Sequence, residues 1–102
     1  MIEMTRERFE ELVSDALDEV PQDLAAQMDN VVVFVEDDAP PDDPTLLGVY
    51  DGIPLTERGA SWAAGAMPDR ITIFRNPTLA ICEKEEDVVE EVRITVVHEI
   101  PW

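Results

Sequence analysis

Two segments with helical periodicity enclose three short apolar runs, and this order restricts the chain to one fold class. At 5–20 and 84–99, apolar residues recur at the i, i+3, i+4, i+7 spacing of an amphipathic helix. The runs at 31–35 and 70–74 are rich in valine, isoleucine and phenylalanine, which favour strands, and the run at 46–50 is apolar and short. We therefore predict an α+β fold with two long helices and three strands.

Local signals set the ends of these elements. Thr5 is expected to cap the first helix, since a threonine oxygen accepts hydrogen bonds from the free N–H groups of a helix start. Pro21 is expected to end that helix and to open a helical turn through 24–28. A further helical turn is predicted at 78–82.

The size and charge of the chain narrow the classes of function. Its 102 residues have room for one modest core, so we expect a single domain over 1–102. The 24 acidic and 7 basic side chains give a net charge of -17. The negative electrostatic potential of such a chain repels nucleic acid and anionic membrane surfaces and attracts basic proteins.

The sequence also predicts a cytoplasmic location. Cys82 is the single cysteine, so the chain has no internal disulfide, which suits a reducing compartment. The chain does not open with a signal peptide, and no apolar run approaches the ~20 residues of a membrane span. The oligomeric state is not readable from these patterns.

Two segments are predicted to be loops. The segment 36–44 contains five acids and three prolines, so we expect it to be exposed and mobile with few hydrogen bonds. Five carboxylates suggest calcium binding, but the spacing, central glycine and closing glutamate of an EF-hand loop are missing. The segment 53–67, with two glycines and many small residues, is expected to be irregular and mobile and has no readable pocket pattern.

The last helix carries a candidate chemical site at its end. On a helical wheel, Val88, Val89, Val92, Val96 and Ile100 gather on the core face. His98 lies off that face, beside Glu91 and Thr95. Glu99 lies near the edge of the core face.

A His-Glu pair of this kind begins the zinc-peptidase motif H-E-x-x-H, in which two histidines four residues apart bind the metal and the glutamate acts as general base. Here Trp102 stands at the second histidine position, and Pro101 is expected to end the helix near Glu99 or Ile100. The plain alternative is that His98 is a surface histidine at a helix C-terminus.

Three segments together resemble one bacterial family. They are Pro54-Leu55-Thr56-Glu57-Arg58-Gly59, Pro68-Asp69-Arg70-Ile71-Thr72-Ile73-Phe74-Arg75 and Glu90-Glu91-Val92-Arg93-Ile94-Thr95-Val96-Val97-His98-Glu99-Ile100. The family is that of the small zincin-like metallopeptidases, sometimes described as minimal gluzincins. The resemblance covers most of the chain, from the first helix to Ile100.

The resemblance implies a fold, an activity and a site. It implies a small twisted sheet backing onto an N-terminal helix and an active-site helix, and hydrolysis of a peptide or protein substrate by zinc-activated water. By analogy, His98 is the first zinc ligand, Glu99 is the catalytic base, and the strand 70–74 lies near the cleft and pairs with extended substrate. The family continues with a second histidine and a downstream acidic ligand, which this sequence lacks, so we expect a C-terminally incomplete zincin-like domain.

Two classes of function remain open from the sequence. The first is a metallopeptidase by lineage that is inactive as written, because a zinc peptidase needs at least three protein ligands and only His98 is in place. A truncation, a disrupted reading frame or an omitted segment before Pro101 would each produce this ending. The second is a non-enzymatic acidic module that binds a basic protein or peptide. A nucleic-acid mimic has nothing beyond net charge in its favour.

Overall fold

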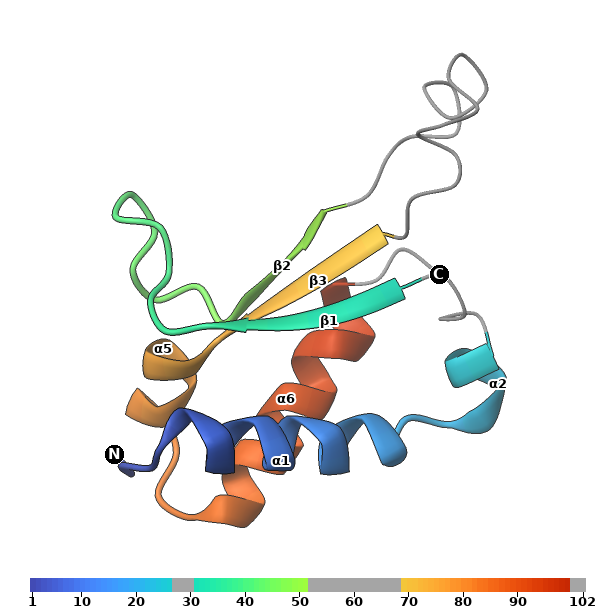
Figure 1. The fold of residues 1–102 in the computed structure, drawn as a ribbon, viewed down its shortest axis with the longest axis horizontal. Coiled ribbons are helices and arrows are strands. Elements are labelled where there is room, and N and C mark those ends of the chain that lie inside the picture. The colour runs from blue at the N-terminus through green and yellow to red at the C-terminus, as the bar shows by residue number, and fades with distance from the viewer. Residues whose placement is uncertain (27–30, 52–68, 100–102) are drawn as a thin grey trace.

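The computed structural model describes residues 1–26, 31–51 and 69–99, coloured along the chain in Figure 1. The elements in chain order are α1 (Arg6–Asp18), α2 (Gln22–Ala25), β1 (Val31–Glu36), β2 (Gly48–Asp51), β3 (Asp69–Phe74), α5 (Arg75–Ala80) and α6 (Glu85–Glu99). The α+β prediction is confirmed. The predicted features at Met28, 53–67 and 100–102 lie outside these ranges. No helix within them is long and apolar enough to cross a bilayer.

The three strands form one mixed sheet with β3 in the centre. The strand order is β1-β3-β2, with β1 parallel and β2 antiparallel to β3. The register pairs Val33 with Ile71 on one side and Tyr50 with Ile71 on the other. The Tyr50 hydroxyl also donates a hydrogen bond to Asp69, so β2 and β3 are joined by a side-chain bond as well as by the ladder.

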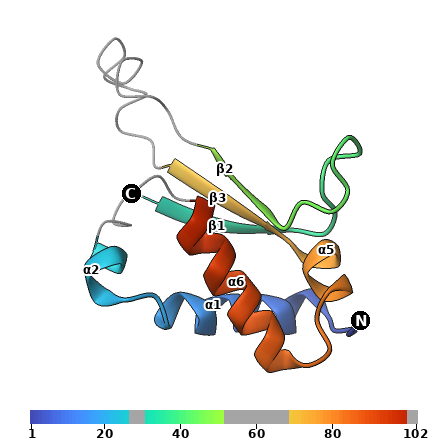
Figure 2. The ribbon, with the colours of Figure 1, turned by 180° about the vertical axis from the view of Figure 1, so that it is seen from behind.

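The helices α1 and α6 cross each other on the same side of the sheet (Figures 1 and 2). One core forms between these helices and the inward side chains of the sheet; its least exposed large members are Phe9, Ile71, Ile73, Val88, Val92 and Val96. The opposite face of the sheet leaves Val32, Phe34 and Val49 exposed. Burial of apolar surface on one side therefore holds the sheet to the helices.

The first helix forms as its sequence predicts. The Thr5 side chain accepts a hydrogen bond from the Arg8 backbone N–H at 3.1 Å, which confirms the N-cap. The predicted apolar stripe is buried at Phe9, Leu12, Val13 and Ala16.

The helical turn predicted at 78–82 begins earlier, at Arg75, directly after β3. Pro77 is tolerated there because it lies in the first turn, where a backbone N–H has no partner within the helix. The Thr78 hydroxyl donates to the Phe74 carbonyl at 2.8 Å and holds the corner between strand and helix.

The acidic loop 36–44 is exposed at most positions, as predicted, but the expectation of few hydrogen bonds is wrong. Asp37 accepts a hydrogen bond from Arg75 at 3.0 Å, and Asp38 accepts one from Asn76 at 2.7 Å. Backbone bonds run from Asn76 N–H to the Asp37 carbonyl and from Asp43 N–H to the Pro40 carbonyl, both at 2.9 Å. The base of the loop is thus fastened to α5; its mobility stays a prediction.

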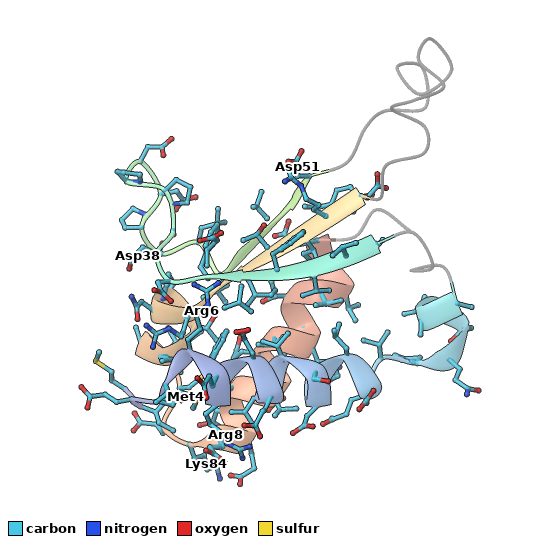
Figure 3. The ribbon with its side chains drawn as sticks, in the orientation of Figure 1. Met4, Arg6, Arg8, Asp38, Asp51 and Lys84 are labelled. Atoms are coloured by element: carbon cyan, nitrogen blue, oxygen red, sulfur yellow. The ribbon has the colours of Figure 1, made fainter. Side chains whose placement is uncertain are left out.

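Two arginines of α1 tie the helix to its surroundings (Figure 3). Arg6 donates to the Val35 carbonyl of the edge strand β1 and forms an ion pair with Asp37 at 3.8 Å. Arg8 points toward the start of α6, where its Nε and Nη2 donate to the two carboxylate oxygens of Glu85 at 3.1 and 2.7 Å. This fork-shaped contact fixes α1 against the first turn of α6.

We expect the Arg8–Glu85 contact to make part of the stability depend on pH. The hydrogen bond from Arg8 holds the pKa of Glu85 below its ordinary value of 4.5. Because the folded-state pKa is the lower one, this stabilisation is present above about pH 4.5 and is lost as the pH falls through the folded-state pKa. Glu85→Gln should therefore lower the free energy of unfolding at about pH 7 and lower it less at about pH 3.

Urea denaturation of both chains at the two pH values measures this difference. The matched control is Glu86→Gln, which removes an exposed carboxylate from the same helical turn and no hydrogen bond found among the described residues. An equal effect of Glu85→Gln at both pH values would show that the carboxylate contributes nothing through Arg8.

Candidate functional site: a groove beside the end of the last helix

A groove of about 420 Å³ separates the second half of α6 from the segment that leads into β2. The helix side consists of Glu91, Ile94, Thr95, His98 and Glu99; the opposite side consists of Asp43, Thr45, Leu46, Leu47 and Gly48. The two candidate residues of the sequence motif therefore line one hollow, together with side chains that lie about fifty residues earlier in the chain.

The phase of α6 places His98 and Glu99 in the groove. Successive turns bury Val88, Val92 and Val96 against the core, which turns His98 outward. His98 is exposed, as predicted, and Glu99 is half-buried. Basic side chains near a helix C-terminus also interact favourably with its partial negative charge when protonated.

Thr95 lines the groove and is buried, although the sequence places it beside the polar residues. Its hydroxyl donates to the Glu91 carbonyl one turn earlier at 2.8 Å, which satisfies the buried polar atom. The side chain can therefore face β2 without an unpaired donor.

Gly48 allows β2 to approach the helix this closely. A Cβ built on Gly48 would lie 2.7 Å from Cγ2 of Thr95 and 2.9 Å from the Thr72 carbonyl oxygen. Both distances are shorter than a normal van der Waals contact. The width of the groove at this point thus depends on the missing side chain at position 48.

The outer edge of β2 presents backbone hydrogen-bonding groups. The Phe74 N–H donates to the Leu47 carbonyl at 2.9 Å, so Leu47 directs its backbone groups toward β3. Because antiparallel pairing alternates, Gly48 and Tyr50 direct theirs away from β3. Neither has a backbone bond to another element within the described ranges. We call this edge, which pairs with no other described strand, the free edge of β2; it borders the groove at Gly48, which lines the groove although it is itself buried.

The expectation that strand 70–74 pairs with substrate is wrong. That strand, β3, is the central one, and both of its edges are occupied by β1 and β2. A further strand has no backbone groups to bond there. The strand that borders the groove with a free edge is β2.

The groove is acidic. Asp43 is exposed, whereas Glu91 and Glu99 are half-buried, and none of the three forms an ion pair with another described residue. Four of the arginines are engaged elsewhere: Arg6 and Arg75 with Asp37, Arg8 with Glu85, and Arg70 with Asp51 at 2.6 Å. Helical spacing pointed to Glu91, which lies two turns before His98, but no sequence signal pointed to Asp43.

Cys82 is not part of this site. Its side chain has no solvent exposure and belongs to the hydrophobic core. Burial, assisted by the negative charges of Glu91 and Asp87, raises the pKa of the thiol to about 11. A thiol that stays protonated in a core is a poor metal ligand and a poor nucleophile.

The sequence profile of the zincin-like metallopeptidases matches residues 28–101, nearly three quarters of the chain. The chain belongs to the zincin-like metallopeptidase family. It is also similar to a solved structure described as a conserved hypothetical protein from Thermus thermophilus, with 28% identity and a TM-score of 0.55. That alignment covers 93% of this chain and 89% of the other. None of the proteins with a curated description matches.

The donor atoms of the groove do not fit the zinc site that the family implies. A catalytic zinc needs three protein ligands and an open position. The chain has one histidine, and position 102 is occupied by tryptophan, whose indole offers no lone pair to a metal. Among the described residues, no three side chains of histidine, cysteine, aspartate or glutamate come together as a ligand set. His98 and Glu99 both line the groove, and the part of the chain that the structure describes supplies no further ligands to complete a zinc site there.

Proposed function

We propose that the groove is the peptide-binding cleft of a zincin-like metallopeptidase, and that these 102 residues bind a peptide or protein segment without hydrolysing it. The observation that carries this proposal is the common position of His98, Glu99 and the free edge of β2 along one groove. An extended peptide can add to such an edge through main-chain hydrogen bonds while its side chains enter the groove.

In the family roles, His98 is the first metal ligand and Glu99 is the general base. Zinc-dependent peptide hydrolysis needs both a bound metal and a base beside it. Here Glu99 has its place at the groove, but the three-ligand metal centre that would supply an activated water is not formed by His98 alone. The proposal therefore separates peptide binding, which the groove supports, from hydrolysis.

A second candidate is an acidic interaction module that binds a basic protein. The net charge of -17 favours it, as do the carboxylates of Asp43, Glu91 and Glu99, which form no ion pair with the described residues. Attraction by net charge alone would not depend on any one carboxylate and would fall steeply with salt. Binding in the groove would depend on named residues.

We expect the purified chain not to retain zinc. A single imidazole without a complete set of further ligands holds zinc weakly, because a structural zinc site gains its affinity from several ligands acting together. After zinc loading and dialysis against a chelator, elemental analysis should find far less than one zinc per chain. Incubation with zinc and unfolded casein should give no cleavage products.

The control for this measurement is His98→Ala, which should leave the zinc content unchanged. Stoichiometric, chelator-resistant zinc that is abolished by His98→Ala would contradict the proposal and would point to ligands supplied by a second copy of the chain. Cleavage of casein that requires Glu99 would contradict it as well.

A further inference from the structure

We propose that the groove selects extended segments that carry a lysine or arginine two residues away from an apolar residue, so that both side chains point to the same side. This inference rests on the proposed function, because it names the class of peptide for the same cleft. The lining of the groove has an apolar part, which suits the apolar side chain, and a negatively charged part, which suits the lysine or arginine side chain.

The apolar part of the lining comes from both sides of the groove. Leu46 and Leu47 on one side and Ile94 on the other are all half-buried, so each has apolar surface left to cover. In an extended peptide, alternate side chains point to the same side. One apolar side chain in contact with these three residues would remove apolar surface from water.

The charged part of the lining also comes from both sides of the groove. Glu91 lies one turn from Ile94 and Thr95 on the helix, and Asp43 lies before the strand on the other side. No lysine or arginine of the described residues lines the groove. The side chains of lysine and arginine can lay an aliphatic stem along Ile94 while the charged head reaches a carboxylate. A glutamate or aspartate in the same place would be repelled.

Glu91 is half-buried, whereas its neighbour Glu90 is exposed. A carboxylate that is partly withdrawn from water is screened less than an exposed one, so an ion pair there is stronger. The neighbouring Glu90 faces a separate hollow, which it shares with Glu19, Glu86, Val89 and Arg93. Glu90 and Glu91 thus carry the same charge, one residue apart, on different faces of α6.

Heptapeptide pools that differ in the central residue test the inference. The central residue is lysine, norleucine or glutamate, the other positions are uncharged, and each pool carries a fluorescein label. Fluorescence polarisation with the full chain should show the order lysine, norleucine, glutamate from strongest to weakest binding. Glu91→Gln should weaken the binding of the lysine pool by about two- to fivefold and leave the binding of the norleucine pool unchanged. Glu90→Gln is the matched control and should change neither.

The outcomes separate the two proposals. If the lysine and norleucine pools bind equally, the groove has no preference for a basic side chain and this inference fails while the proposed function stands. If Glu90→Gln and Glu91→Gln weaken the binding of the lysine pool equally, the preference comes from net charge, and the inference is overturned as well. If no pool binds, both proposals fail. Asp43→Asn in the Glu91→Gln background should weaken the lysine pool further.

Discussion

Replacing Gly48 by alanine is expected to destabilise the fold and to change the groove at the same time. The added Cβ would lie 2.7 Å from Cγ2 of Thr95 and 2.9 Å from the Thr72 carbonyl oxygen. One contact is with a side chain and the other with the backbone of the central strand, so β2 must move away from both α6 and β3. We expect a loss of about 1–3 kcal/mol in the free energy of unfolding, measured by urea denaturation.

A second substitution tests the cause of this loss. Thr95→Ser removes Cγ2 and keeps the hydroxyl that donates to the Glu91 carbonyl. In the double variant we expect part of the Gly48→Ala effect to disappear, while the contact with the Thr72 carbonyl remains. Strict additivity of the two substitutions would show that Thr95 does not limit the position of β2. Val49→Ala, at the exposed neighbouring position, is the control and should have a small effect.

Phe9→Ala is expected to produce the largest loss of stability. The Phe9 side chain has no solvent exposure and belongs to the core cluster that joins α1 to α6 and the sheet. Truncation of a buried phenylalanine costs about 3–5 kcal/mol, since it removes buried apolar surface and leaves a cavity. A domain of this size is stable by about 5–15 kcal/mol, so a large share of the variant molecules should unfold in mild denaturant.

The control on the same helix is Ser14→Ala. Ser14 is exposed, so its replacement should change the free energy of unfolding by less than about 0.5 kcal/mol. If Phe9→Ala cost no more than Ser14→Ala, α1 would not be held by its apolar stripe. The assignment of one core to the whole domain would then be wrong.

The sequence predicted most of the helices and strands because their signals are local. The apolar spacing of α1 and α6 and the β-branched runs of β1 and β3 reflect which side chains each element must bury. Most element ends moved by only a few residues. The start of α5 at Arg75 was missed because Pro77 is read as a helix breaker, although it is harmless in a first turn.

Half of the candidate site was also predictable from local geometry. The helical wheel put His98 on the same side as Glu91 and Thr95, because residues three, four and seven apart share a helix face. The structure brings all three to one groove. The burial of Thr95 was not predictable, since it depends on how closely β2 approaches at Gly48.

The sequence by itself determined the elements, the acidic surface and the outward phase of His98. The tertiary structure decided which strand lies in the centre, and therefore that β2 rather than β3 borders the groove with a free edge. It also brought Asp43 into the groove that Glu91 lines, and it placed Cys82 in the core. The physical reason is the distance along the sequence over which each property is determined. Helix phase and strand propensity depend on a few neighbouring residues, whereas strand order and the lining of the groove depend on which distant segments bury their apolar faces together.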